Sequence, residues 1–188
     1  MIEIKILLKK FYMNDTKQVA KDLLGKTFVR KIGTKVLSGI ITETEAYKGK
    51  NDPASHASRK RTERNKIMFG EVGIAYVYFT YGMHYCFNVV AKKKNDIAGA
   101  VLIRAIQPQQ GINHMIKNRK TDNISNLANR PGKLTQAMQI TLKQYNHDLT
   151  KKSSMFIIDG EKPNKIIAKP RVGIKIGVDK LWNFSYKI

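Results

Sequence analysis

One carboxylate in this chain stands among aromatic residues in a way that could do chemistry. Tyr47 follows Glu45 at a spacing of two, and Tyr76 and Tyr78 alternate later in the chain. Aromatic faces can stack on an extruded nucleic-acid base, while a partly desolvated carboxylate can accept a proton from water. Strand carboxylates are also often held in salt bridges, and alternating tyrosines often pack in a core. The residue types alone leave both interpretations open.

The segment TYGMHY around Gly82 has bulky residues where a turn normally carries small polar ones. Tyr81, Met83 and His84 would occupy the tip of this hairpin. Proteins that unstack DNA push a bulky side chain between base steps, so a stiff tip carrying Tyr81 could act in this way. A tip folded back onto the protein is the alternative.

Two basic residues have equally ambiguous positions. Arg104 interrupts the apolar strand VLIRAI, so its guanidinium is either paired with a buried carboxylate or aimed at a phosphate. Lys133 lies at a predicted helix start, where backbone N–H groups and a cation together favour phosphate. Ordinary helix capping explains the position of Lys133 as well.

Metal chemistry has little support in the sequence. His56 could be a metal ligand, but the four histidines lack short ligand spacing and no carboxylate cluster accompanies them. The single cysteine, Cys86, excludes an intrachain disulfide and a Cys-rich metal site. We therefore expect neither a metal nor a cofactor.

The charge of the chain points to a polyanionic partner. Lysine and arginine total 35 against 14 acidic residues, which gives a formal net charge of +21. Dense backbone phosphates attract such a surface, so nucleic acid is the simplest partner, and RNA competes with DNA for that role. An anionic membrane surface, a ribosome or a merely solvated basic face are the alternatives.

The start of the chain carries no targeting signal that we can identify. The segment MIEIKILLKKFY is too short to span a membrane and has no small-residue cleavage site. We expect a cytoplasmic protein without membrane contact, associated with the nucleoid if the source is bacterial.

The spacing of apolar residues predicts a mixed α and β fold. Asp15, with Gln18 three residues later, can cap a helix that ends at Gly25. The predicted strands lie at 27–32, 35–47, 74–81, 83–91, 99–106, 155–159 and 171–177. Further helices are expected after Pro108 and over 131–142, and surface loops over 48–65 and 118–130.

Strand alternation within 35–47 has a specific consequence for the acidic residues. It places Leu37, Ile41, Glu43, Glu45 and Tyr47 on one face, so carboxylates would share a face with aliphatic core residues. A chain of 188 residues without a linker or internal repeat is expected to form one domain over 1–188.

Several motifs in a fixed order resemble one family. They are ETEAY at 43–47, ASHA at 54–57, RNKIMFGEVGIAYVYFTYGMHYCFNVV at 64–90, VLIRA at 101–105 and PGKLTQA at 131–137. Together with PRVGI and WNFSY near the end, they resemble the alkyladenine (3-methyladenine) DNA glycosylase family of the mammalian type. The resemblance implies a single-domain α+β fold around a curved, mostly antiparallel sheet, open and barrel-like, with surrounding helices and a protruding β-hairpin.

The resemblance also implies roles in the reaction. Glu45 is similar to the general base that activates the attacking water, and Arg104 to a neighbour that orients the site. The residues that would hold the flipped base are Tyr47, His56, Tyr78 and Asn88. Among them, Asn88 occupies the position that crowds the exocyclic amine of guanine.

The remaining implied roles concern the DNA itself. Tyr81, with Met83, would fill the gap that the flipped base leaves, and Lys133 and Arg64 would contact the backbone of duplex DNA. Arg130 departs from the family pattern, which commonly has glycine there. The resemblance implies a monomeric enzyme that removes alkylated purines without cutting the strand. A non-catalytic module that binds damaged DNA is the rival interpretation.

Overall fold

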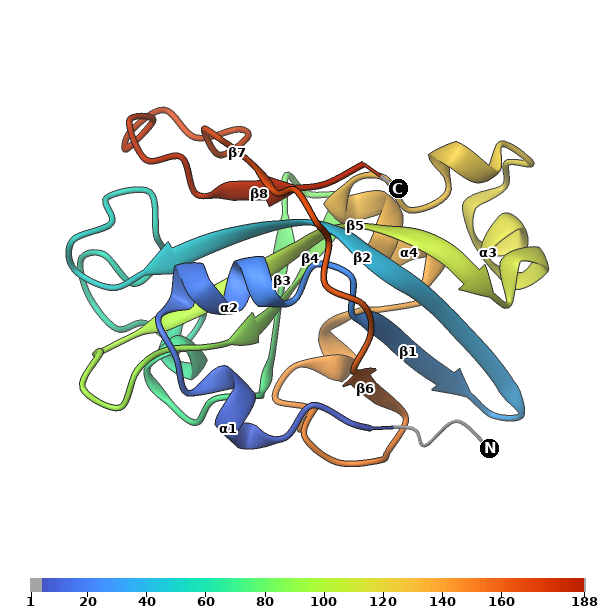
Figure 1. The fold of residues 1–188 in the computed structure, drawn as a ribbon, viewed down its shortest axis with the longest axis horizontal. Coiled ribbons are helices and arrows are strands. Elements are labelled where there is room, and N and C mark those ends of the chain that lie inside the picture. The colour runs from blue at the N-terminus through green and yellow to red at the C-terminus, as the bar shows by residue number, and fades with distance from the viewer. Residues whose placement is uncertain (1–4, 188) are drawn as a thin grey trace.

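The computed structural model describes residues 5–187 as one antiparallel sheet with short helices around it (Figure 1). The strands are β1 (Thr27–Ile32), β2 (Lys35–Lys48), β3 (Ala75–Thr80), β4 (His84–Val90), β5 (Gly99–Gln110), β6 (Met155–Ile158), β7 (Ile167–Lys169) and β8 (Asn183–Ser185). Their order is β3-β4-β5-β2-β1-β6, and β8 pairs with both β2 and β7. The long strands β2 and β5 form the centre of this sheet.

Four α-helices and three single turns of 3₁₀ helix cover the described part of the sheet. The α-helices are α1 (Lys9–Tyr12), α2 (Thr16–Asp22), α3 (Ile112–Arg119) and α4 (Pro131–Ala137), and the 3₁₀ turns are η1 (Lys66–Phe69), η2 (Ile124–Asn126) and η3 (Leu142–Gln144). As predicted, Asp15 caps α2, because its carboxylate accepts from the N–H of Lys17. Gln18 does not complete a capping box and instead donates to Asp22.

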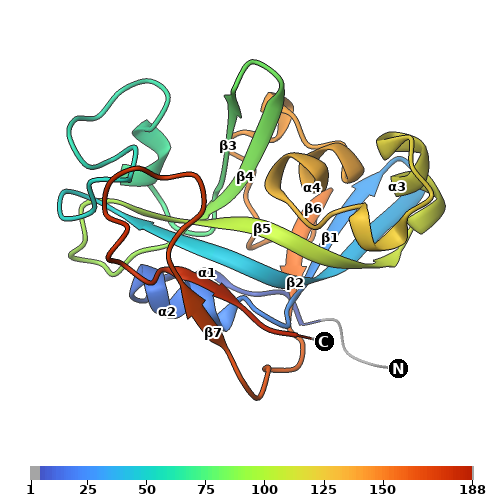
Figure 2. The same ribbon diagram turned by 90° about the horizontal axis from the view of Figure 1, so that it is seen from above.

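The two sides of the central strands are used differently (Figure 2). Helices α1 and α2 lie on one side of β2 and β5. The hairpin β3–β4 projects on the opposite side, where α3 and α4 also lie. The predicted α+β fold with a curved, mostly antiparallel sheet, surrounding helices and a protruding hairpin is therefore confirmed.

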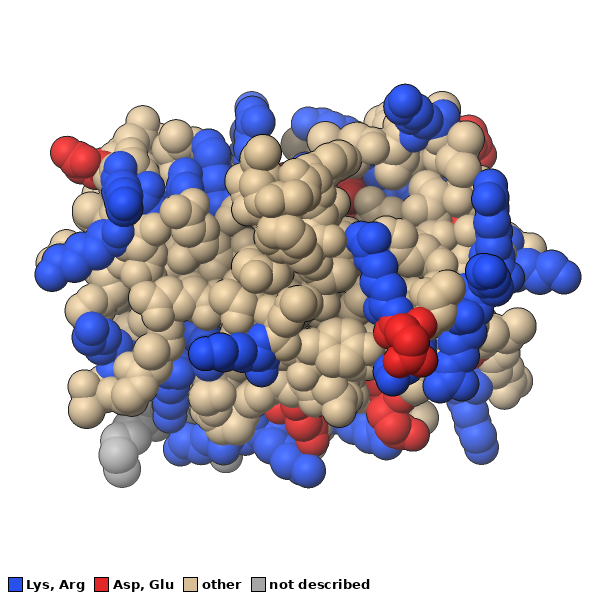
Figure 3. Space-filling model, turned by 180° about the vertical axis from the view of Figure 1, so that it is seen from behind, with Lys and Arg blue, Asp and Glu red and all other residues tan. Residues whose placement is uncertain are grey.

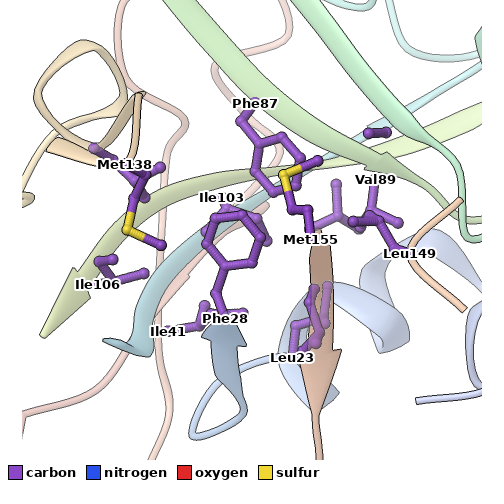
Figure 4. Close-up of a cluster of buried hydrophobic side chains, with 14 of the residues drawn as sticks. Leu23, Phe28, Ile41, Phe87, Val89, Ile103, Ile106, Met138, Leu149 and Met155 are labelled. Atoms are coloured by element: carbon purple, nitrogen blue, oxygen red, sulfur yellow. The ribbon is translucent and has the colours of Figure 1, made fainter. Parts of the chain in front are cut away.

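The main hydrophobic core fills the inside of the curled sheet (Figure 4). Phe28 of β1 and Phe87 of β4 stack there with ring centroids 4.7 Å apart. Leu23 beside α2 and Met138 beside α4 are fully buried in the same cluster. Since β4 is anchored in this core at its inner end, the outer end of the hairpin can project from a rigid base.

Strand β2 contains irregularities that change which residues face the core. Its pairing with β5 shifts register between Ile41 and Glu43 and again between Glu43 and Thr44. Before the shifts Leu37 and Ile41 belong to the core, and after them Ala46 does. A bulge adds an unpaired residue and so moves the inward positions by one. The prediction that the carboxylates share a face with the aliphatic residues is therefore wrong.

The helix predicted after Pro108 is present as α3, but it begins later than predicted, because β5 continues to Gln110 and α3 begins only at Ile112. Pro108 pairs with Gly39 next to a shift of register in β2. Proline cannot donate a ladder hydrogen bond, so such an irregularity is where a strand tolerates it.

The strand predicted over 171–177 is also wrong. This segment is a loop in the structure, and only Ile167–Lys169 before it forms a strand. Gly173 and Gly177 have φ values of +76° and +68°, which an extended strand does not permit. Figure 2 shows this loop reaching to the side of the sheet on which the hairpin projects.

None of the helices that the structure describes is long and apolar enough to cross a membrane. The start of the N-terminal segment considered above, residues 1–4, lies outside the described residues.

Candidate active site

An open cavity of about 720 Å³ lies between the hairpin, α4, the C-terminal end of β2 and the N-terminal half of β5. Seven of the ten predicted site residues line it: Tyr47, His56, Tyr78, Tyr81, Asn88, Arg104 and Lys133. Residues from five separate parts of the chain therefore meet at one place. The other three are Glu45, which lies behind this lining, and Arg64 and Met83.

Glu45 is completely buried, and hydrogen-bond donors surround its carboxylate. Its Oε1 accepts from the backbone N–H of Val172 at 2.7 Å and from Nδ2 of Asn183 at 3.1 Å. Its Oε2 accepts from the hydroxyl of Tyr47 at 2.7 Å and lies 3.4 Å from Nη1 of Arg104. These contacts fix the orientation of the carboxylate behind the lining of the cavity, since Tyr47, Arg104 and Val172 all line it.

Arg104 links the two carboxylates of β2. Its Nε donates to Oε1 of Glu43 at 2.8 Å, and Asn183 donates to the same oxygen at 2.6 Å. Burial by itself would lower the pKa of Arg104, but the attraction of Glu45 and Glu43 outweighs it and raises that pKa. Of the two alternatives for Arg104, the structure shows the pairing with carboxylates, of which Glu45 is buried and Glu43 is partly exposed.

The groups around Glu45 suit proton transfer. Burial, followed by the neighbouring charge of Glu45, raises the pKa of Tyr47, so the hydroxyl remains a donor at neutral pH. A positioned carboxylate with such donors can hold a water molecule and take its proton.

Among residues 5–187, no group of three or more His, Cys, Asp or Glu side chains could hold a metal ion.

An aromatic wall faces this acidic site. The ring of His56 lies edge-on to Tyr78 at 4.8 Å between centroids, and its Nδ1 is 2.9 Å from the hydroxyl of Tyr76. Burial and the positive charge of Arg64 lower the pKa of His56, which favours a neutral imidazole. Nδ2 of Asn88 donates to the carbonyl of Tyr76 at 3.0 Å and thereby holds the Asn88 side chain at this wall.

The tip of the hairpin projects into solvent. Tyr81 is 79% exposed and Met83 is 68% exposed, so the alternative of a tip folded back onto the protein is wrong. Tyr81 has a φ of +52°, and Gly82 has a φ of +65°. A tyrosine held in the left-handed region is strained, and such strain is often found at functional positions.

Basic residues from α3 and α4 form another edge of the cavity. Arg119, Arg130 and Lys133 all line it, and Lys133 contacts the side-chain oxygens of Asn126 and Asn129. Figure 3 views the face toward which the hairpin projects, where lysines and arginines surround a central area without charge. Such a face can contact a polyanion around an apolar projection.

Arg64 takes a position that its predicted role does not explain. Its guanidinium lies 4.8 Å from the centroid of the Tyr78 ring, and its side chain borders a second hollow formed by the loop 53–65. Arg64 is exposed, so contact with a DNA backbone stays a prediction.

Four residues of the site were not predicted from the sequence. Val172 and Asn183 donate to Glu45 from the C-terminal region, and Arg171 forms a buried pair with Asp52. The only signals were the motifs PRVGI and WNFSY and the dipeptide Asp52-Pro53. A backbone N–H such as that of Val172 has no side-chain signal at all.

Comparison with known proteins assigns the chain to a family. The sequence model of the family described as Methylpurine-DNA glycosylase (MPG) matches residues 10–187. The chain is 47% identical to a protein of Prosthecochloris aestuarii, over 94% of this chain and 85% of that protein. It is 46% identical to one of Carboxydothermus hydrogenoformans (97% and 95%) and 43% identical to one of Methanocella arvoryzae (97% and 92%). Each relative has the provisional name of a 3-methyladenine DNA glycosylase, and the chain itself belongs to the methylpurine-DNA glycosylase family.

Proposed function

We propose that this DNA glycosylase removes alkylated purines from duplex DNA by hydrolysis, with Glu45 as the general base. The observation that carries the proposal is a fully buried carboxylate, hydrogen-bonded to residues that line an aromatic cavity beside an exposed hairpin tip. 3-Methyladenine and 7-methylguanine are the expected substrates, and hypoxanthine and ethenoadenine are further candidates. The protein acts as a monomer, close to the DNA that it repairs.

The reaction breaks the bond between the sugar and the base. Glu45 accepts a proton from water, the water oxygen bonds to the anomeric carbon, and the bonding electrons leave with the purine. Alkylation at N3 or N7 makes the base cationic, so it departs as a neutral molecule. Positive charge that builds on the sugar is stabilised by the carboxylate, and Arg104 keeps that carboxylate in place.

The flipped base lies against the aromatic rings of Tyr47, His56 and Tyr78. Electron-rich rings attract a cationic base by about 1 kcal/mol or more once water is excluded. This attraction favours alkylated purines over normal adenine, while Asn88 excludes the exocyclic amine of guanine. A neutral His56 adds no positive charge that would repel the lesion.

DNA binding uses the face around the cavity. Tyr81 and Met83 enter the base stack from the hairpin tip and occupy the gap left by the flipped nucleotide. Lys133 and Arg64 contact backbone phosphates. Since no lysine lies in contact with Glu45 among the described residues, we propose base removal without strand cleavage.

The first test is incubation of the purified protein with methylated duplex DNA in EDTA, with the released bases identified by chromatography. We expect free 3-methyladenine and intact strands. Glu45→Gln should slow excision by about 10²-fold or more while lesion binding is kept, because only the acid–base group is lost.

Glu43→Gln is the matched control, since Glu43 shares Arg104 and Asn183 with Glu45 but makes no contact with Tyr47. An equal loss in both variants would contradict the assignment of the base to Glu45. Lesion binding without any excision by the unmodified protein would instead support a non-catalytic module, and tighter binding to structured RNA would support an RNA-binding protein.

A further inference from the structure

A buried ion pair lies directly behind the proposed catalytic carboxylate. Arg171 and Asp52 have side chains without solvent exposure, and both terminal nitrogens of Arg171 donate to the carboxylate of Asp52 at 2.7 Å. Removing two charges from water costs several kcal/mol per ion, so a pair of this kind is weak evidence for stability. Its geometry indicates a different use.

The pair fastens two distant segments to the strand that carries Glu45. Nη1 of Arg171 also donates to the carbonyl of Ala46 at 3.0 Å, and Asp52 accepts from the N–H of Lys48 at 3.0 Å. The loop after β2 and the loop before β8 are therefore both attached to β2 within three residues of Glu45.

The guanidinium of Arg171 also lies over two aromatic rings. Its central carbon lies 4.7 Å from the ring centroid of Tyr47 and 5.1 Å from that of Trp182. Arg171 does not line the cavity that Tyr47 lines, so it supports this ring from outside the cavity. A planar cation stacked on a ring restricts its movement.

The neighbours of these residues in the chain are the donors to Glu45. Val172, whose N–H donates to Oε1, follows Arg171, and Asn183, which donates to the same oxygen, follows Trp182. The contacts of Arg171 therefore fix the backbone position of Val172. They also fix the ring of Trp182, which precedes the second donor, Asn183.

We propose that Arg171, paired with Asp52, is a positioning residue for the glycosylase reaction, which holds Val172 and Tyr47 in place against the carboxylate of Glu45. This role rests on the proposed function. It assigns the C-terminal loop to the catalytic machinery, although the loop contributes no catalytic side chain.

The test uses the double variant Arg171→Met with Asp52→Asn, which leaves no unpaired buried charge and so preserves folding better than either single change. Excision should fall by about 10²-fold, the effect of a displacement of about 1 Å in a catalytic group. Affinity for a duplex with a reduced abasic nucleotide should stay within a factor of about three, because no DNA-contacting group is removed.

The matched control is Arg30→Met. Arg30 is a buried arginine of β1 whose hydrogen bonds within residues 5–187 go only to the carbonyls of Lys31 and Ser154. Its loss lowers stability without touching the site, so excision per folded molecule should be unchanged. The single variant Arg171→Lys should be more active than the double variant, since it keeps a buried positive charge opposite Asp52.

Two further measurements separate positioning from general destabilisation. In the Glu45→Gln background the double variant should cause almost no additional loss of excision, because the group being positioned is already absent. Fluorescence of Trp182, the only tryptophan, should change when the guanidinium beside it is removed.

Each failure has a separate meaning. Full excision by the double variant, or a loss that is fully additive with Glu45→Gln, would overturn the positioning role and leave the proposed function intact. Absence of excision by the unmodified protein, measured in the same assay, would overturn the proposed function together with this role.

Discussion

The wall around Glu45 and the tip of the β3–β4 hairpin lie at opposite extremes of order. Glu45 has no exposed surface and accepts hydrogen bonds from three residues of the chain, while Tyr81 is 79% exposed. The proposed proton transfer depends on a fixed geometry, for which buried and mutually bonded groups are suited. Insertion into a base stack depends instead on a side chain that is exposed to solvent. The difference predicts that changes in the wall affect the rate, whereas changes at the tip affect binding.

The largest effect is expected from Arg104→Met in the wall. The variant leaves the carboxylates of Glu43 and Glu45 without their shared cation, and an unpaired buried charge costs about 3–5 kcal/mol. Excision should fall by about 10²-fold because the carboxylate loses its orientation. Urea unfolding and single-turnover excision measure the two effects.

The second substitution Glu43→Gln, added to Arg104→Met, separates these effects. It removes one of the two uncompensated charges, so part of the stability should return while excision stays low. A variant that excises at the normal rate would show that Arg104 does not position the carboxylate.

A smaller effect, on affinity for DNA rather than on the rate of excision, is expected from Tyr81→Gly at the tip. Glycine accepts a φ of +52° without strain, so the free energy of unfolding should stay the same or rise by about 1 kcal/mol. Affinity for lesion DNA should fall about tenfold, since stacking of one aromatic ring contributes about 1–3 kcal/mol. Fluorescence anisotropy with a lesion duplex measures the affinity.

Tyr81→Phe is the control for this prediction, because it keeps the ring and removes only the hydroxyl. We expect it to bind as the unmodified protein does. Normal affinity in Tyr81→Gly, or a rate loss without an affinity loss, would contradict the separation between wall and tip.

The sequence predicted the tip better than the wall, and the reason is the range of the contacts. A hairpin around Gly82 follows from residues that are neighbours in the chain, and the β-rich composition on each side of Gly82 predicted both of its strands. The contact of Val172 with Glu45 joins positions that are 127 residues apart. No local pattern contains that information, and only the resemblance to a family hinted at the terminal motifs.

Strand β2 shows how a local pattern can give the right residues for a wrong reason. Alternation did place Glu43, Glu45 and Tyr47 on one face, but it joined Leu37 and Ile41 to them. The bulge that separates the two groups depends on pairing with β5, whose own register shift is not written in β2. Glu45 and Tyr47 nonetheless keep their predicted common face, because both lie beyond the last register shift of β2.

The smallest predicted effect concerns His56, which belongs to the aromatic wall with Tyr76 and Tyr78. Burial and then Arg64 lower its pKa, so the folded protein binds this proton less readily than the unfolded chain does. The corresponding stability is present above the unfolded pKa of about 6.5 and is lost as the pH falls below it toward the folded pKa. Arg64→Met should raise the pKa of His56 toward the unfolded value. It should thereby narrow the pH range over which this stability is lost. Arg61→Met, in the same loop, should leave it unchanged. Titration of the His56 ring by NMR, assigned with His56→Gln, measures the shift, and an unchanged or lower pKa in Arg64→Met would mean that Arg64 does not influence the aromatic wall.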